Sequence, residues 1–432
     1  MRDQRDRYGN PVTTRSTEAF DAYCLGLDLF LAAQAGAIEK LTEATELDPQ
    51  FALARAHLAR ALQIIAKPKD ALEHMAQAQE CAEVLKGEGA EQQRNHIDIM
   101  AMLVRGKSPQ VFERIKAHLK NYPRDVLMLQ PCCGVFGLIG FSGRTDREQE
   151  NVEFMAAFRK HYVDDWWFES QYAFALCETS ELAEAEKINE RAFGANPANA
   201  NAVHHRAHIH YESGEFEAGR KQLNEWRGSY SRDGLLHCHL AWHDALWALA
   251  ANDLERLWQI VEADISPEVT TAPPINVMTD LVAVLFRAHL AGVQCPQGLW
   301  EKASDYAARC FPQPGISFAD AHSVIAHSVI AHTNDAAHPA STARPDTASS
   351  LIDLQNTTRG WASDSVAALT HAFSAFLNQD WGECLGKLEP AMTNHERLGG
   401  SRAQRDLLEL TRATVQLRLG QQPESPRVQR FL

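Results

Sequence analysis

Seven histidines lie between His204 and His243, and four of them form two pairs with a spacing of four residues: His204 with His208, and His239 with His243. Side chains four residues apart lie on the same face of a helix, so both imidazoles of such a pair reach one point. This spacing is a standard way of holding a metal ion on a helix. Neutral imidazole suits zinc, iron, nickel and copper, so the pairs are predicted to bind a divalent transition metal if their helices face one another.

The same histidines are compatible with other roles. Imidazole titrates near neutral pH, so these side chains also suit an anionic ligand, or general acid–base work in a metal-dependent enzyme. They could equally lie on a helix surface of a purely structural assembly subunit, which would have no pocket. The sequence has no HExxH, GxSxG, P-loop or dinucleotide-binding motif, so no catalytic residue is assigned.

Aromatic residues lie next to the histidine pairs. His204, His208 and Tyr211 follow i, i+4, i+7 on one helix stripe, and Trp242 lies beside the second pair. Histidine and tryptophan favour a small closed pocket, because a peptide scaffold usually presents Lys, Arg or Asn along its groove. We therefore predict a pocket for a small molecule or peptide, with His210 packed inward on the neighbouring apolar stripe.

The segments around the histidines have the pattern of paired helices. Residues 51–83 and 172–197 each carry apolar residues at helical spacing on both sides of a break, with prolines at helix boundaries. A helix–turn–helix unit of about 34 residues with small alanines where the helices cross is typical of the tetratricopeptide repeat. Because one unit cannot bury its apolar face, units must stack into a solenoid. The predicted fold is all-α: a tetratricopeptide-repeat-like (TPR-like) α-solenoid of antiparallel helix pairs without a β-sheet, whose concave groove the histidines line.

Composition divides the chain into five parts. Residues 333–350 are rich in Ala, Pro, Ser, Thr and Asp and poor in large apolar residues, so they are predicted to form a flexible loop. The parts are an N-terminal extension (1–15), the TPR-like helical solenoid (16–332), the flexible loop (333–350), C-terminal helical repeats (351–420) and a tail (421–432).

The overall charge limits the class of partner. Asp and Glu number 56 against 42 Lys and Arg, a net charge of −14, whereas nucleic acids and anionic membranes require a basic surface. The longest apolar run, residues 132–141, is too short to cross a bilayer, and the charged N-terminus lacks the apolar core of a signal peptide. Nine scattered cysteines without a CxxC pair are typical of reduced thiols. We expect a cytoplasmic protein that binds neither nucleic acid nor membrane; whether it forms a homo-oligomer is left open.

Five motifs resemble those of a known family. In order they are VHHRAHIH (203–210), CHLAWHDAL (238–246), TDLVAVLFRAHLAG (279–292), FADAH (318–322) and LGGSRAQRD (398–406). Through them the chain, from about residue 16 to about residue 415, resembles the tetratricopeptide repeat protein 38 family. The resemblance implies a helical repeat fold and no particular biochemical activity.

The resemblance also implies site residues. It matches family histidines with His204, His208, His210, His239 and His243, and a family Asp-Ala-His with Asp320 and His322, which adds the last two to the predicted pocket. Two positions depart from the family. Tyr211 stands where the family usually has Glu, and Cys133-Gly134 stands where it has His-Asp, so no role of those family residues carries over.

The last motif has a local structural explanation. Ser401 has the position of an N-cap, and Gln404 completes a capping box at the start of a helix. The charged residues of the same motif, Arg402, Arg405 and Asp406, are kept as candidates for the groove.

Overall fold

The chain folds into helices throughout the part that the computed structural model describes, residues 4–106, 108–337, 345–423 and 425–429. Consecutive helices pack as antiparallel pairs. The first pairs are α1 (Thr17–Leu31) with α2 (Ala37–Leu47) and α3 (Ala52–Ile64) with α4 (Pro68–Glu83). The predicted class, an all-α TPR-like solenoid, is confirmed.

The histidines belong to the central helix pairs. These are α9 (Trp166–Glu178) with α10 (Leu182–Ala195), α11 (Ala200–Ser213) with α12 (Phe216–Arg227), and α13 (His237–Ala250) with α14 (Leu254–Ile260), which a π-helical turn (Val261–Ile265) continues. The first helices of these pairs begin 34 and 37 residues apart. This period is the one expected of TPR-like units.

A glycine lets one helix approach its two neighbours closely. A Cβ atom at Gly219 of α12 would lie 2.8 Å from Cβ of His210 in α11 and 2.8 Å from ring carbons of Trp247 in α13. No side chain fits there without displacing a neighbour. Gly219 therefore fixes α12 against both helices that carry the histidine pairs.

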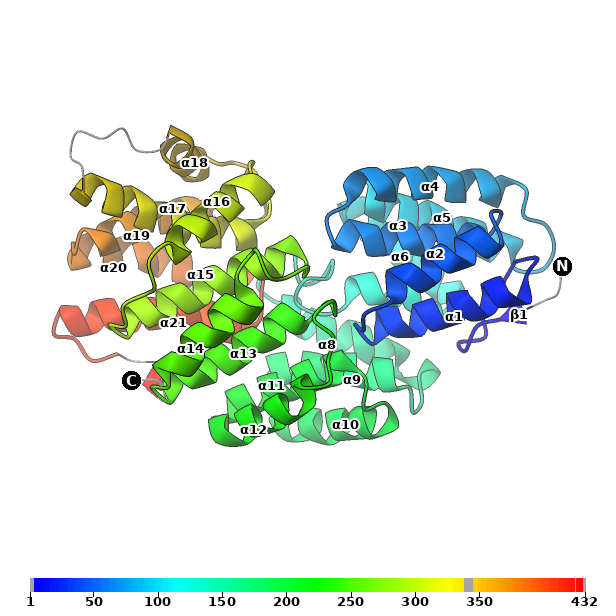
Figure 1. Cartoon of the computed structure of the whole chain (residues 1–432), viewed down its shortest axis with the longest axis horizontal. Helices are drawn as coiled ribbons and strands as arrows, with labels where there is room; N and C mark the ends of the chain where they lie inside the picture. Colours follow the sequence, from blue (N-terminus) through cyan, green and yellow to red (C-terminus); the bar gives the residue numbers. More distant parts are fainter. Residues whose placement is uncertain (1–3, 107, 338–344, 424, 430–432) are drawn as a thin grey trace.

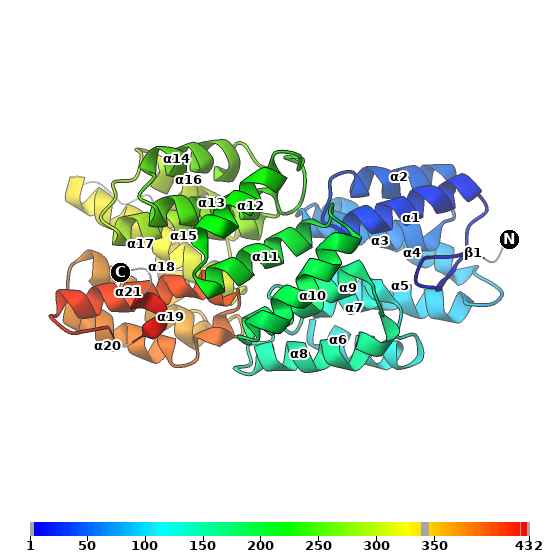
Figure 2. The ribbon, with the colours of Figure 1, turned by 90° about the horizontal axis from the view of Figure 1, so that it is seen from below.

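Two large hydrophobic cores lie on either side of the central pairs. One is formed mainly by α1–α9 and the other mainly by α13–α21. The helices not yet named are α5 (Ala90–Val104), α6 (Ser108–Asn121), α7 (Val126–Leu129) and α8 (Arg147–Phe158), then α15 (Pro274–Leu290), α16 (Leu299–Cys310), α17 (Ser317–Ala337), α18 (Pro345–Gln355), α19 (Ser363–Leu377), α20 (Trp381–Met392), α21 (Arg402–Arg418) and α22 (Pro426–Gln429). Figure 1 shows the two groups at opposite ends of an elongated molecule, and Figure 2 shows α10 and α11 between them.

The N-terminal extension differs from the expectation of no β-structure. Two strands of two residues each, β1 (Gln4–Arg5) and β2 (Pro11–Val12), pair antiparallel. The carboxylate of Asp6 accepts hydrogen bonds from the backbone N–H groups of Tyr8 and Asn10, both at 2.9 Å, and these close the turn between the strands. Tyr8 is buried, and Nε2 of Gln92 in the later helix α5 donates to Oδ1 of Asn10 at 3.1 Å, which holds the extension against the helices.

The predicted flexible loop at 333–350 is wrong in its bounds. Helix α17 continues to Ala337 and α18 begins at Pro345, while residues 338–344 lie outside the described residues. Alanine favours the helix interior and proline favours the first helical position, which explains why helices extend into both ends of this segment. Helices before and after it contribute to the same core, as Val284 and Phe373 do.

The predicted tail also carries structure. Helix α22 begins at Pro426, and Nη2 of Arg427 donates to Oε1 of Glu212 in α11 at 2.6 Å. The C-terminal residues that the structure describes therefore return to the central pairs. Across the described residues, no helix combines the length and the apolar character needed to span a membrane.

Candidate ligand-binding and metal site

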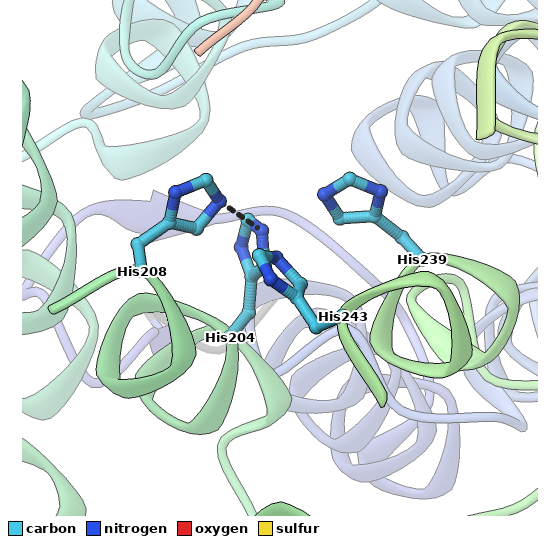
Figure 3. Close-up of side chains that lie close together, drawn as sticks. All are labelled: His204, His208, His239 and His243. Atoms are coloured by element: carbon cyan, nitrogen blue, oxygen red, sulfur yellow. Dashed lines mark hydrogen bonds between the residues drawn. The ribbon is translucent and has the colours of Figure 1, made fainter. Parts of the chain in front are cut away.

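Helices α11 and α13 direct the two histidine pairs toward one another. Helix α11 starts at the N-cap Asn199, whose side chain accepts a hydrogen bond from the N–H of Asn201, and ends at Gly214 in the left-handed conformation. In Figure 3, His204 and His208 extend from one helix, and His239 and His243 extend from the other into the same space. The pairs converge, as their spacing predicted.

The four imidazoles contact one another within and across the helices. Ring centres are 4.6 Å apart for His204–His208 and 5.1 Å for His239–His243. Across the helices they are 4.8 Å apart for His204–His239 and 4.6 Å for His208–His243. Nε2 of His208 lies 2.9 Å from Nε2 of His204, so one ring donates a hydrogen bond to the other. One nitrogen from each ring lies within 4.8 Å of all the others, so four potential ligand atoms surround one point.

Burial keeps three of the four imidazoles neutral. His204 and His239 are 8% and 4% exposed, and His208 and His243 are fully buried. Burial, followed by the neighbouring imidazoles of the cluster, lowers the pKa of His204, His208 and His243 well below the usual value. Their lone pairs are therefore available at neutral pH, which is the state in which histidine binds a metal ion.

Two buried carboxylates stand behind the histidines. Both carboxylate oxygens of Asp280 in α15 lie 2.9 Å from Nδ1 of His239, which leaves Nε2 of that ring for the centre of the cluster. Oε1 of Glu178, the last residue of α9, lies 3.9 Å from Nδ1 of His208. Burial, and next the carboxylate of Glu148, raise the pKa of Glu178 to about 7. Carboxylates in these positions orient metal-binding imidazoles and raise their basicity.

Several polar atoms of the cluster have no hydrogen-bond partner among the described residues. They are Nδ1 and Nε2 of His243, Nδ1 of His208 and Oε1 of Glu178. Leaving such a buried atom unpaired costs about 1–3 kcal/mol, and each unpaired group calls for an explanation. A metal ion that accepts a lone pair from one nitrogen of His243, together with a hydrogen bond from Nδ1 of His208 to Oε1 of Glu178, would satisfy three of these four atoms.

The cluster forms part of the wall of a cavity of ≈ 560 Å³. His204, His208 and His239 line it, with the neighbouring His205, whereas His243 lies behind them. Aromatic side chains cover much of the remaining wall, namely Phe30, Phe136, Phe141, Trp167 and Phe174, and polar side chains are Arg60, Gln63, Gln130, Gln171, Asn201, Asn276 and Gln404. The volume and the mixture of apolar wall and few polar groups suit a small molecule.

Besides His243, four residues of the predicted pocket lie outside the cavity wall, and two of them support the histidine-bearing helices from behind. Trp242 is completely buried in the core, and its ring stacks on His239 with centres 5.1 Å apart. The hydroxyl of Tyr211 donates to Oδ2 of Asp406 at 2.9 Å and accepts from Arg287 at 3.2 Å. Both side chains point to the C-terminal core because they continue the apolar packing of α11 and α13 rather than the cavity face.

The other two, Asp320 and His322, lie in the first turns of α17. Oδ2 of Asp320 accepts a hydrogen bond from the N–H of Gly315 at 2.9 Å, and Nδ1 of His322 donates to the backbone oxygen of Phe318 at 2.8 Å. Burial raises the pKa of Asp320 to about 7 and lowers that of His322 to about 4. Their hydrogen bonds are local to the start of α17, and neither side chain lines the histidine cavity.

His210 packs away from the cluster, as expected from its position on the apolar stripe. Its Nδ1 lies 3.0 Å from Oε2 of Glu215 and its Nε2 lies 3.1 Å from Oε1 of Gln222. Both partners belong to the turn and helix that follow α11. His210 therefore joins α11 to α12.

The capping motif supports Glu178. Ser401 and Gln404 form the capping box that the sequence predicted, at the start of α21. The backbone N–H of Arg402 donates to Oε2 of Glu178 at 2.8 Å. With Arg405 and Asp406, Arg402 lines a separate, charged cavity of ≈ 470 Å³ on the far side of Glu178. Of these three residues, Arg402 is linked to the histidine cluster through the carboxylate of Glu178.

A second buried histidine cluster was not foreseen. Nδ1 of His96 and Nε2 of His118 both lie 2.8 Å from Oδ2 of Asp125, and Nε2 of His57 lies 2.8 Å from Nε2 of His96. Burial opposes ionisation of Asp125, but the two imidazoles offset it and lower its pKa. These residues come from three helices and one turn, so no local spacing could reveal them.

Asp280 did leave a signal in the sequence. It directly precedes the apolar run Leu281–Phe286, all of which is buried, and it is the one charged residue in that run and the helical turn before it. A carboxylate in such a helix requires a polar partner. Glu178 left no comparable signal, because its run ends in an ordinary polar turn.

Comparisons with known proteins show remote likenesses. No family model matches the chain. Solved structures similar to it include a human IFIT1 dimer with PPP-AAAA (10% identity, 96% of this chain and 89% of that chain, TM-score 0.43) and Naa15/Naa10 bound to HypK-THB (13%, 85% and 61%, 0.24). A third is the TPR domain of P58(IPK) (14%, 93% and 99%, 0.21). The antiparallel pairs described above themselves define the protein as a TPR-like helical repeat protein.

Proposed function

We propose that this protein binds a divalent transition metal through His204, His208, His239 and His243, and that the metal forms part of a pocket for a small molecule. The observation that carries the proposal is the convergence of four buried imidazole nitrogens within 4.8 Å of one another. Two carboxylates behind the rings and the unpaired nitrogens of His243 support it.

The spacing of the nitrogens fits one ion after small ring rotations. Ligand nitrogens at 2.0–2.1 Å in a tetrahedral site are about 3.3 Å apart, and Nε2 of His208 and Nε2 of His204 are 2.9 Å apart. The ligand set holds imidazole and no thiolate, which suits zinc, copper, nickel or iron. Because three of the four histidines line the cavity, a small molecule there would reach the ion.

Binding is favoured over catalysis by the cavity wall. No Asp or Glu of the described residues lines this cavity, so its wall offers no carboxylate as a general base. A metal-dependent enzyme that uses the same four histidines is the alternative function. A purely structural subunit would need no pocket. The volume of ≈ 560 Å³ and the mixture of aromatic wall and few polar groups suit a small molecule.

We also infer from the five ordered motifs that the chain is a member of the tetratricopeptide repeat protein 38 family, acting in the cytoplasm. The nine free cysteines support a reducing compartment.

The test is a metal titration of untagged protein. Protein stripped with a chelator is titrated with zinc, nickel and copper salts in a calorimeter, and protein as purified is subjected to elemental analysis. We expect a single ion per chain. Replacing His243→Asn or His208→Asn should lower the affinity by about 100-fold or more, since even an outer carboxylate is worth 10–100-fold.

The matched control is His210→Asn, a change on the same helix as His208 that faces α12 instead of the cluster. It should leave the affinity unchanged, and circular dichroism should show equal helix content in all three variants. Wild-type protein that takes up no ion, or asparagine variants that bind as tightly as wild type, would remove the basis of the proposal.

A further inference from the structure

The wall of the histidine-lined cavity is chemically unlike the rest of the protein. The chain carries 56 Asp and Glu residues and a net charge of −14, yet the described lining residues include neither Asp nor Glu. Among them, the permanently charged side chain is that of Arg60. A ligand in this cavity therefore meets positive charge and no negative charge.

Arg60 has unused hydrogen-bond donors within the described part of the chain. It lies near the end of α3, and its Nη1 donates to Oε1 of Gln63 at 2.6 Å. Its Nε atom is buried without a hydrogen-bond partner in the described part of the chain. Burial lowers the pKa of Arg60 to about 10, with no carboxylate contributing to it, so the guanidinium stays charged at neutral pH. A half-buried cation with no carboxylate beside it in the cavity wall is unfavourable, so the site favours an anion.

The free edge of Arg60 has the geometry of a carboxylate receptor. Nη1 is engaged by Gln63, whereas Nε and Nη2 form the other edge of the planar guanidinium. That edge can donate two parallel hydrogen bonds to the two oxygens of a carboxylate. A singly charged acid balances the single arginine, whereas a phosphate monoester would bring about two charges.

The other residues of the cavity wall indicate the chemistry of the rest of the ligand. Phe136, Trp167 and Phe174 provide an apolar and aromatic surface, and the amide of Gln171 in the same wall can donate a hydrogen bond to a polar group. The cavity of ≈ 560 Å³ is large enough for a molecule with a ring and a short chain.

We infer that the ligand of this cavity is a small organic carboxylate, with its acid group on Nε and Nη2 of Arg60 and its apolar body along the aromatic wall. This inference rests on the part of the proposed function that places a small molecule in the cavity. It does not require the metal ion.

The test uses three probes with one carbon skeleton: phenylbutanoate, phenylbutanol and phenylbutylamine. Each is titrated calorimetrically into the full-length protein, once metal-free and once loaded with zinc. The acid should bind at least about tenfold more tightly than the alcohol, the gain expected of a charge-assisted pair, and the amine should bind most weakly.

Variants then locate the acid group. Arg60→Gln should bring the affinity for the acid down to that for the alcohol and leave the alcohol unchanged, whereas Arg60→Lys should keep part of the preference. The matched control is Arg105→Gln, an exposed arginine whose Nη2 donates to Oε1 of Gln79 at 2.7 Å, outside the cavity lining. It should bind all three probes as wild type does.

The outcomes separate this inference from the metal proposal. An acid preference that depends on Arg60 in the metal-free protein supports the inference, even if the metal titration fails. Equal binding of acid, alcohol and amine, an acid preference that survives Arg60→Gln, or no binding of the acid at millimolar concentration overturns it, even if the protein binds a metal ion.

Discussion

Replacing Asp280→Asn tests whether the carboxylate behind His239 contributes to a metal site. Both oxygens of Asp280 lie 2.9 Å from Nδ1 of His239, and Asp280 is 1% exposed. Asparagine has the same shape and still offers an oxygen to the ring N–H, but it carries no charge. The substitution therefore removes the electrostatic part of one contact and little else.

The expected loss of metal affinity follows from the charge on the carboxylate that accepts the hydrogen bond from His239. A hydrogen bond to a charged group contributes about 1.5–3 kcal/mol and a neutral one about 0.5–1.5 kcal/mol, so the difference is about 1–2 kcal/mol. Since about 1.4 kcal/mol corresponds to tenfold in affinity, metal affinity should fall by roughly 5- to 30-fold. Burial raises the pKa of Asp280, so the ionised carboxylate does not stabilise the metal-free fold at neutral pH. The metal-free variant should then melt close to wild type.

The assay is calorimetric metal titration together with thermal unfolding of the metal-free protein. An exposed carboxylate serves as the control, Asp21→Asn on α1, which should change neither quantity. Two results would refute the reasoning: unchanged metal affinity in Asp280→Asn, or a large loss of stability in the absence of metal with no further loss of affinity.

Three further predictions concern the stability of the fold. Burial lowers the pKa of His205 to about 3. Below about pH 6.5 the unfolded chain therefore binds a proton at this residue that the folded protein does not, and the wild type loses stability as the pH falls. In urea titrations at pH 7 and pH 5, the loss of unfolding free energy should be about 2 kcal/mol smaller for His205→Asn than for the wild type. A pH dependence identical to that of wild type would contradict this. Gly219→Leu should destabilise the protein by about 2–3 kcal/mol, because its side chain must displace Trp247; an unchanged melting temperature would show that the helices can move apart. Ser401→Ala removes one half of a capping box and should cost about 1 kcal/mol in denaturant unfolding, while Ser401→Asp should retain most of the stability and so distinguish capping from packing.

Local features of the chain were readable from the sequence because they depend on residues close together along it. The helices, their pairing at a period near 34 residues and the capping box at Ser401 and Gln404 follow from apolar spacing and from the types of residue at helix ends. The convergence of the two histidine pairs also followed, because an i, i+4 spacing fixes the helix face and stacking of repeats brings successive faces together.

The composition of 333–350 was misleading about where the neighbouring helices end. Few large apolar residues indicated a loop, but alanine favours a helix without needing a core, so α17 and α18 enter this segment from both ends. Tyr211 was placed in the pocket because it shares a helix stripe with His204 and His208, and Trp242 because it lies beside the second pair. A step of one residue turns Trp242 to another face of α13, and Tyr211 lies one turn further along α11, where both side chains join the C-terminal core.

Only the tertiary structure decided what surrounds the histidines. Asp280 and Glu178 reach His239 and His208 from helices 41 and 30 residues away along the chain, and Arg60 joins the same cavity wall from α3. His57, His96 and Asp125 likewise meet only through the packing of the N-terminal helices. Such contacts depend on the angle and distance between whole helices, which many side chains set together, and no short stretch of sequence records them.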